Sequence, residues 1–286
     1  MSSSTGRQFS VEFFPPRTAA GEEKLDEVHG ELARLNPDFF SVTYGAGGST
    51  KQGTRQIVLR YKAAGSCVAP HLSFGGLEES ELEALLMDYK SAGINRLVAL
   101  RGDIPSGMGS GRQHRYANEL VAFIRKVTGD YFHIDVACYP EIHPESKNYQ
   151  SDVEFFKRKV DAGANSAITQ YFYNAEAYFR FVDYCAAQGI TIPIVPGTMP
   201  ITNYANLARF SANCGAEIPQ WLSRRLEMFG EDAESLRDFG TDVVCRLCEQ
   251  LLDGGAPGLH FYSMNLSRNV TQIWNNLSLA ERRLPA

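Results

Sequence analysis

The chain has 286 residues, of which 44% are hydrophobic and 21% charged, and this is the composition of a globular protein with one large core or two small ones. The net charge of -5 and the scattered basic residues give no reason to expect nucleic acid or an anionic membrane as the partner. No apolar run is long enough to span a membrane, and residues 1–8 lack the apolar core of a signal peptide. We therefore expect a cytoplasmic protein with a disordered polar tail at residues 1–8.

The first expected element is an apolar run at residues 10–14, which ends at Pro15 and Pro16 because proline has no N–H to donate to a strand ladder. Apolar periodicity then alternates between the helical and the extended pattern. We expect helices over residues 22–35, 53–64, 78–92, around 120–127, 152–162 and 176–187, with further helical material at 203–253. We expect the later strands over residues 38–43, 67–71, 96–101, 133–138, 166–171, 192–195 and 258–262.

This alternation is typical of an α/β protein with a parallel sheet. Eight strand–helix units in one chain, close to the roughly 250 residues that a closed (β/α)8 barrel needs, predict a single TIM barrel over residues 9–286. The rival is an open doubly wound sheet, which usually binds dinucleotides through G-x-G-x-x-G after its first strand. The nearest segment, residues 44–50, follows the second strand and lacks both the third glycine and the G-K-[ST] of a P-loop.

Cys245 and Cys248 are the only two of the six cysteines that lie close together. Their C-x-x-C spacing can bind zinc or perform redox chemistry, but it falls inside an amphipathic helical pattern. No second pair or nearby histidine completes a metal site. We expect buried thiols, no metal and, in a reducing compartment, no disulfides.

Glu12 interrupts the apolar first strand, where an ionised carboxylate is costly without a partner. Burial there would raise the pKa of Glu12 and make it a proton carrier near neutrality. A TIM barrel has its active site at the C-terminal ends of its strands, so polar residues at those ends carry functional weight. The strand ends supply Glu12, Thr43, Tyr44, His71, Arg101, Asp103, Tyr139, Glu141, His143 and Gln170.

Two long polar connections, at residues 102–116 and 139–151, join these strand ends to the following helices. The first is rich in glycine and carries Arg112 and Arg115, and the second precedes a helix with Arg158 and Lys159. These loops suit an elongated ligand that carries phosphates. They are equally compatible with two solvated surface loops.

The strand-end residues suit more than one chemistry. Metal-assisted hydrolysis would need several histidine and carboxylate ligands in one place, and here they are separated by tyrosine, arginine and glutamine. A retaining glycosidase would use two carboxylates, for which Glu12 and Glu141 are candidates. The two tryptophans, Trp221 and Trp274, lie late in the chain and offer little for stacking on sugars.

Nine motifs, in order along the chain, resemble the methylenetetrahydrofolate reductase family. They are VEFFPPR at 11–17, VTYGAGG at 42–48, PHL at 70–72, LRGD at 100–103, YPEIHP at 139–144, KVDAGA at 159–164, ITQYF at 168–172, VPGTMP at 195–200 and HFY at 260–262. Each motif alone is weak evidence. Their order over nearly the whole chain makes the resemblance specific.

The resemblance implies a flavin-binding TIM barrel in which hydride passes from NADH or NADPH to FAD and then to 5,10-methylenetetrahydrofolate, giving 5-methyltetrahydrofolate for methionine synthesis. It implies that Glu12 is the general acid, which typically contributes on the order of 10²- to 10⁴-fold. Asp103 would lie near the flavin and the pterin, and Gln170 would bind the pterin or the nicotinamide, with Asn206 and Phe210 also against substrate. The implied FAD contacts are Thr43, Tyr44, Ala46, His71, Arg101, Gly102, Asp103, Tyr116, Ala117, Tyr139, His143, Asp152, Arg158 and Lys159.

The sequence departs from the family after its last strand, where Leu266 stands in place of the usual arginine. Either Arg268 reaches the folate from one turn further on, or this contact is absent. The chain resembles the short bacterial form, without a regulatory domain that binds S-adenosylmethionine, and family members commonly form homodimers or homotetramers. The alternative from another class is a non-catalytic folate- or flavin-binding barrel that serves as a subunit of a methyl-transfer assembly.

Overall fold

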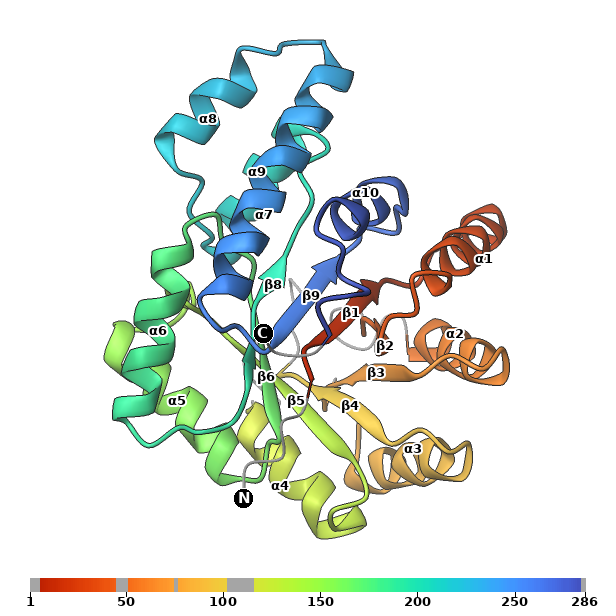
Figure 1. Ribbon diagram of the computed structural model, residues 1–286. Helices are drawn as coiled ribbons and strands as arrows, with labels where there is room; N and C mark the ends of the chain where they lie inside the picture. The colour runs from red at the N-terminus through yellow and green to blue at the C-terminus, as the bar shows by residue number, and fades with distance from the viewer. Residues whose placement is uncertain (1–5, 45–50, 75–76, 102–115, 284–286) are drawn as a thin grey trace.

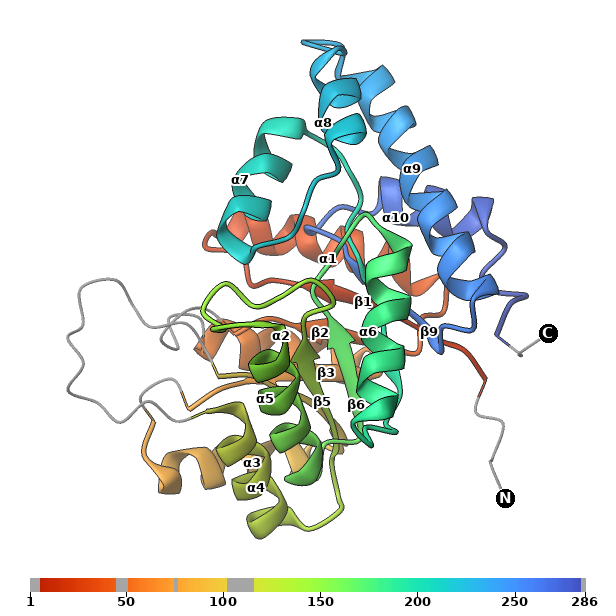
Figure 2. The same ribbon diagram turned by 90° about the vertical axis from the view of Figure 1, so that its left-hand side faces the viewer.

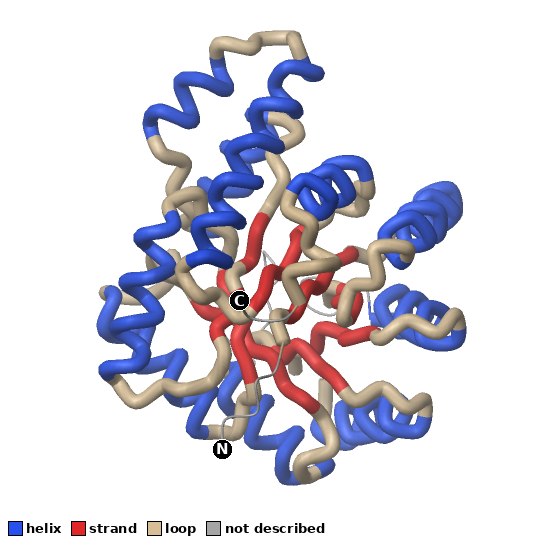
Figure 3. The backbone as a smooth tube through the Cα atoms, viewed as in Figure 1, coloured by secondary structure: helices blue, strands red, loops and turns tan. Residues whose placement is uncertain are grey.

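The computed structural model describes residues 6–44, 51–74, 77–101 and 116–283. Its strands form one ring of parallel ladders with the helices packed outside it (Figures 1 and 3), so the predicted TIM barrel is confirmed. The ladder order is β7-β6-β5-β4-β3-β2-β1-β9-β8. The strands are β1 Gln8–Phe13, β2 Phe39–Val42, β3 Val68–Leu72, β4 Arg96–Ala99, β5 His133–Cys138, β6 Ser166–Thr169, β7 Ile194–Val195, β8 Gly197–Thr198 and β9 Gly258–Tyr262.

The barrel closes at Pro196, which divides the seventh strand of the ring into β7 and β8. The first half pairs with β6 and the second half pairs with β9. Pro196 has no N–H for a ladder, but its carbonyl accepts the N–H of His260 at 3.0 Å. Gly197 follows because a Cβ there would collide with the carbonyl oxygen of Thr169 and the ring of Tyr262. The nine labelled strands are therefore the eight strands of a closed barrel.

The helices alternate with the strands as expected, and polar side chains cap several of them. Thr18, for example, accepts the Gly21 N–H at the start of α1, and Asn148 accepts the Ser151 N–H at the start of α5. The helices are α1 Ala19–Ala33, α2 Lys51–Ala63, α3 Glu79–Ser91, α4 Ala117–Thr128, α5 Tyr149–Asp161, α6 Ala175–Ala187, α7 Tyr204–Cys214, α8 Gln220–Glu227, α9 Ala233–Asp253 and α10 Arg268–Asn276.

Two regions differ from the expected elements. The helical material expected at 203–253 forms three helices, because Gly215 ends α7 in a left-handed conformation with φ 75° and Gly230 lies between α8 and α9 with φ 52°. Helix α8 and the first turns of α9 lie farthest from the barrel (Figure 2), and the rest of α9 returns to pack beside α6 and α10. At the amino terminus, β1 begins at Gln8, inside the segment expected to be a tail, and pairs there with Gly258.

Alternation along the strands separates two layers of side chains. Phe9, Val11 and Phe13 are fully buried in the large cluster between strands and helices. A second, smaller cluster has as its buried members Phe39, Ala69, Val98 and Ile168. Buried polar side chains also lie within several strands. They include Ser10, Ser41, Asp135, Ser166, Thr198 and His260.

The helices within the described ranges include none that is both long and apolar enough to cross a bilayer.

Candidate active site

Glu12 is the central carboxylate at the C-terminal end of the barrel, which we call the mouth. Its side chain is 18% exposed, and its Oε2 lies 3.4 Å from Nε2 of His71 and 3.6 Å from Nε2 of His260. Neither contact has hydrogen-bond geometry, and both imidazole nitrogens are buried without a hydrogen-bond partner among the described residues. The Nε2 atoms of two imidazoles therefore face one carboxyl group at the base of the mouth.

The strand period places these groups together. Ser10 and Glu12 share one face of β1, and His260 and Tyr262 share the corresponding face of β9, which pairs with β1. The Ser10 hydroxyl and Nδ1 of His260 form a buried hydrogen bond of 2.7 Å. The Tyr262 hydroxyl donates to the carbonyl of Thr169 at 2.7 Å. These bonds fix the ring orientations of His260 and Tyr262.

A cavity of about 540 Å³ opens above Glu12 and His71, within the range of small-molecule sites. Helix α7 covers part of this cavity, which explains how Phe210 reaches a site that otherwise comes from strand ends. Gln170, at the end of β6, has its Oε1 bonded to the N–H of Tyr171 at 3.0 Å. The other described lining residues include Thr43, Tyr44, Tyr139, Tyr171, Met199, Asn213, Cys214, Tyr262 and Met264.

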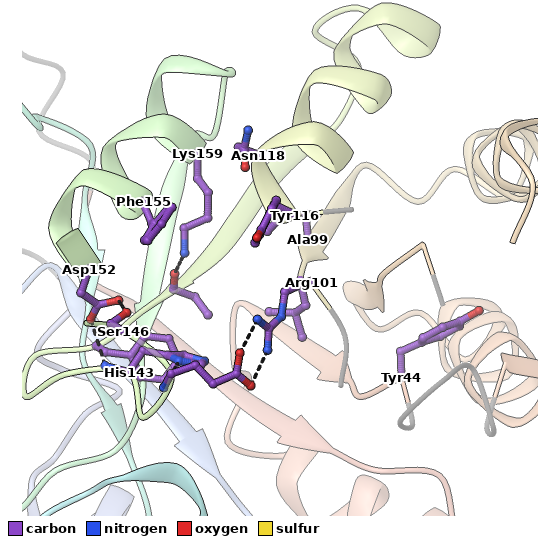
Figure 4. A pocket seen from close by; sticks show the side chains of 15 residues that line it. Tyr44, Ala99, Arg101, Tyr116, Asn118, His143, Ser146, Asp152, Phe155 and Lys159 are labelled. Atoms are coloured by element: carbon purple, nitrogen blue, oxygen red, sulfur yellow. Dashed lines mark hydrogen bonds and ion pairs between the residues drawn. The ribbon is translucent and has the colours of Figure 1, made fainter. Parts of the chain in front are cut away.

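A second cavity, of about 340 Å³, adjoins the first and shares Tyr44, Arg101, Tyr139 and His143 with it. Helix α5 contributes Asp152, Phe155 and Lys159 to this cavity (Figure 4). The spacing i, i+3, i+7 places these three residues on one stripe of the helix. Helix α4 contributes its first residues from the opposite side, Ala117 and Asn118, together with the capping residue Tyr116.

Arg101 and Glu145 join the two cavities. The Arg101 guanidinium donates two hydrogen bonds to the Glu145 carboxylate, at 2.6 and 2.9 Å, and the dashed lines at Arg101 in Figure 4 mark this bidentate pair. Both residues line both cavities. Such a planar fork suits carboxylate and phosphate equally. The Arg101 side chain is therefore held at a position where it could also bind an anionic ligand.

Burial lowers the pKa of several basic residues that line the cavities, because it disfavours their charged forms. Desolvation lowers the pKa of Lys159, opposed by Cys138 and Asp152, and its ammonium donates to the carbonyl of Ala137 at 2.5 Å. Desolvation also lowers the pKa of His143 and of His71, although Glu12 opposes the shift at His71. Burial therefore favours the neutral form of both imidazoles.

Most of the predicted site residues of the described chain line one of the two cavities. They are Glu12, Thr43, Tyr44, His71, Arg101, Tyr116, Ala117, Tyr139, His143, Asp152, Lys159, Gln170 and Phe210. Ala46, Gly102 and Asp103, with Arg112 and Arg115, lie outside the described residues.

Four candidates are not among the residues that line either cavity. The guanidinium of Arg158 lies 4.9 Å from the centroid of the Phe155 ring. Asn206 accepts a hydrogen bond from Arg209 on the exposed face of α7. Glu141 accepts the N–H of Glu217 at 2.8 Å, and burial raises its pKa despite that bond. Arg268 is exposed at the start of α10.

The turn after β9 explains the position of Arg268. Met264 and Asn265 both have positive φ, 54° and 55°. The Asn265 side chain accepts the N–H of Phe14 and donates to its carbonyl. This turn keeps Met264 in the wall of the larger cavity and leaves Leu266 exposed.

Sequence reasoning missed His260, Tyr262 and Phe155 as site residues. Strand alternation could have identified the first two, because both fall on the inward face that β9 shares with Glu12 across the ladder. Phe155 could have been found from its helical spacing to Asp152 and Lys159.

The family model described as "Methylenetetrahydrofolate reductase" matches residues 2–278. The chain belongs to this family. It is 42% identical over 274 residues to the 5,10-methylenetetrahydrofolate reductase of Buchnera aphidicola subsp. Schizaphis graminum, covering 95% of this chain and 92% of that protein. It is 38% identical over 288 residues to methylenetetrahydrofolate reductase (NADH) 1 of Arabidopsis thaliana, covering 96% of this chain and 48% of the plant protein.

Among solved structures, an uncharacterized Clostridium thermocellum protein described as binding two copies of 5-methyl-5,6,7,8-tetrahydrofolic acid has a TM-score of 0.68 with this chain. The match covers 96% of each chain at 16% sequence identity. At this level of identity the likeness supports the barrel fold.

Proposed function

We propose that the protein reduces 5,10-methylenetetrahydrofolate to 5-methyltetrahydrofolate, with FAD as the bound hydride carrier and NADH or NADPH as the donor. The observation that carries the proposal is the Glu12 carboxyl group facing two imidazoles at the base of a cavity that also presents Gln170 and Phe210. Membership of the reductase family gives that arrangement its chemical context. The Arabidopsis relative named for NADH supports a nicotinamide nucleotide as donor.

The residues present fit a flavin dinucleotide. The two adjoining cavities, of about 340 and 540 Å³, suit an elongated ligand better than either cavity does alone. Arg101 and Lys159 would bind the phosphates, whereas His71, whose buried Nε2 has no hydrogen-bond partner among the described residues, would face the ring system together with Thr43 and Tyr139. When bound, FAD would accept a hydride from the nicotinamide and give it to the folate.

Glu12 would hold a proton and donate it to a ring nitrogen of the folate, which opens the five-membered ring of the substrate. Nε2 of His71, 3.4 Å from Oε2 of Glu12, would help to hold the carboxyl group in position. The hydrogen bond between the Ser10 hydroxyl and Nδ1 orients the His260 ring toward the same Oε2 atom. These contacts would keep the proton carrier in place while water is excluded by Tyr262 and Met264.

Gln170 and Phe210 would bind the substrates from opposite sides of the larger cavity. The amide of Gln170 offers a donor to the pterin or to the nicotinamide amide. Phe210 offers an aromatic face for stacking. Because hydride donor and acceptor would use the same cavity in turn, we expect ping-pong kinetics. The product would supply methyl groups for methionine synthesis, and we expect a cytoplasmic homodimer or homotetramer.

Absorption spectroscopy of the purified protein, reconstituted with FAD under anaerobic conditions, tests this function. We expect the flavin band to bleach on addition of NADH or NADPH and to return on addition of 5,10-methylenetetrahydrofolate. A band that bleaches and does not return would contradict the folate as acceptor, and would favour the non-catalytic folate- or flavin-binding barrel if the folate still binds. A protein that cannot be reconstituted would overturn the whole assignment.

A further inference from the structure

Helix α7 carries a cation at the edge of the larger cavity. Phe210 and Asn213 of this helix line the cavity, and Arg209 lies directly before Phe210 and one helical turn before Asn213. The Arg209 guanidinium lies 5.3 Å from the centroid of the Phe210 ring. Its positive charge is therefore held beside a ring that lines the cavity.

This guanidinium has no counter-ion within the described part of the chain. It donates a hydrogen bond to the side-chain oxygen of Asn206 at 3.2 Å, which is a neutral partner, and it makes no ion pair with a described carboxylate. Helix α7 contains no aspartate or glutamate, and Arg209 is exposed. A surface arginine needs no counter-ion, but one at the edge of a ligand cavity is placed to receive an anionic group of the ligand.

The rim of the mouth beyond the ends of β1 and β9 is different, because it is apolar. The turn after β9 places Met264 in the cavity wall, and the neighbouring Leu266 and Phe14 are 44% and 40% exposed. The polar side chain of Asn265 is occupied by its two hydrogen bonds to the backbone of Phe14. An anionic group would lose water against this part of the rim, whereas at α7 it would gain a charge-assisted hydrogen bond.

The proposed substrate carries its negative charge at one end. A folate consists of a pterin, a p-aminobenzoyl group and a glutamate with two carboxylates. In the proposed function the pterin lies at the base of the cavity, near Glu12 and Gln170, so the glutamate points out of the mouth. The nicotinamide nucleotide, which uses the same cavity in turn, carries phosphates, and a guanidinium binds carboxylate and phosphate alike. Both ligands therefore offer an anion, and the test has to separate them.

We propose that Arg209 binds the glutamate carboxylates of the folate and thereby determines a preference for folates with a charged glutamate. The inference rests on the proposed function, because it needs the pterin to enter first. The p-aminobenzoyl ring then lies against Phe210, and the carboxylates lie beside the Arg209 guanidinium, away from the apolar rim at Leu266.

The test measures, by calorimetry on the FAD-reconstituted protein, the Kd of 5-methyltetrahydrofolate and of its diamide, in which both carboxylates are neutral amides. Exposed ion pairs contribute little, so we expect Arg209→Gln to raise the Kd of the acid about three- to fivefold and to leave that of the diamide nearly unchanged. Arg209→Lys, which keeps the charge, should lose less. High salt should reduce the difference between wild type and Arg209→Gln, because salt screens exposed charges. Arg224→Gln, at an exposed arginine on α8, is the matched control and should change neither Kd.

An unchanged Kd of the acid in Arg209→Gln, or an equal rise for acid and diamide, would overturn the role of Arg209 and leave the proposed function standing. A wild-type protein that binds neither folate would overturn the proposed function itself. Flavin reduction by NADH or NADPH tests the other anion, and we expect its dependence on nucleotide concentration to be nearly unchanged in Arg209→Gln. A greater loss there than for the folate would assign Arg209 to the nucleotide and overturn the proposal. A greater rise in folate Kd in Arg268→Gln than in Arg209→Gln would place the carboxylates at α10 and overturn it as well.

Discussion

The two ends of the barrel each contain an acidic side chain, and these two groups have different kinds of partner. At the mouth, Glu12 faces His71 and His260 at 3.4 and 3.6 Å without a hydrogen bond to its carboxylate from any described residue. At the other end, Asp135 is fully buried and receives two hydrogen bonds from Arg96, at 2.6 and 2.9 Å. The group at the mouth is exposed to ligands, and the other is enclosed.

The cluster around Asp135, which we call the floor, is satisfied throughout. Ser166 also donates to Asp135, Arg96 reaches Gln8 at 2.8 Å, and the Arg96 guanidinium lies 3.9 Å from the centroid of Phe39. Burial alone would raise the pKa of Asp135, but Arg96 and His133 outweigh it and hold the pKa below its usual range. The comparison teaches that Asp135, whose oxygens are occupied by protein donors, belongs to the fold, whereas Glu12, which receives no hydrogen bond on its carboxylate from a described residue, is left available to a ligand in the cavity above it.

The largest effect should come from Glu12→Gln, which keeps the shape of the mouth and removes its proton. We expect the rate at which the folate reoxidises the reduced flavin to fall by on the order of 10²- to 10⁴-fold, with reduction by NADH or NADPH nearly unchanged. Stopped-flow absorption measures the two half-reactions separately. Glu141→Gln is the control, since its amide oxygen can still accept the Glu217 N–H; a similar loss in that variant would show that the effect is not specific to Glu12.

Asp135→Asn should affect stability instead. Removing one partner of a buried ion pair costs about 3–5 kcal/mol because the other charge remains buried, and we expect that loss in the free energy of unfolding measured with urea. The matched control is Asp88→Asn, which breaks the bidentate pair between Asp88 and Arg55 at the surface and should cost about 0.2–1 kcal/mol. Equal losses in the two variants would contradict the contrast between buried and exposed pairs.

As the pH falls, the contribution of His71 at the mouth to folding stability should change at a higher pH than that of Asp135 in the floor. The pKa of His71 is lowered from 6.5 by burial, so the unfolded chain binds its proton more readily, and stability falls as the pH drops below about 6.5. The contribution of Asp135, with its lowered pKa, is lost only below about pH 3.9. The free energy of unfolding, measured with urea between pH 7.5 and 5, should depend less steeply on pH in His71→Gln than in the wild type. Some dependence should remain, because the pKa values of His29 and His143 are also lowered. An unchanged pH dependence in His71→Gln would show that His71 does not contribute to it.

The smallest effect should come from Arg268→Ala. Arg268 is exposed and absent from the cavity wall, whereas Met264 on the same turn lines the larger cavity. We expect the folate Kd to stay within about twofold in Arg268→Ala. In Met264→Ala it should rise several-fold, because the partly buried Met264 side chain would lose apolar contact with the ligand worth about 1 kcal/mol, which is roughly fivefold in Kd. A large loss in Arg268→Ala would restore it as a substitute for the arginine that Leu266 replaces.

Periodicity and motif order in the sequence determined the barrel and most of the site. Alternating helical and extended patterns require a parallel sheet, and strand ends in such a barrel meet at one edge, so Glu12, His71 and Gln170 could be placed together before any coordinates. Glu12 could also be singled out locally, because an ionised carboxylate inside an apolar strand is energetically unfavourable without a partner.

Only the tertiary structure decided which partners the polar groups have. Asp135 and Glu12 each interrupt a strand, and nothing local distinguishes them, because their partners come from residues far along the chain: Arg96 for one and His260 for the other. The stacking of Phe155 in α5 beside Tyr116 at the start of α4 is also a contact between distant residues. So is the hydrogen bond that Glu141 accepts from the N–H of Glu217. A carboxylate's role depends on the charge and hydrogen bonds that surround it, and in this protein those are long-range contacts.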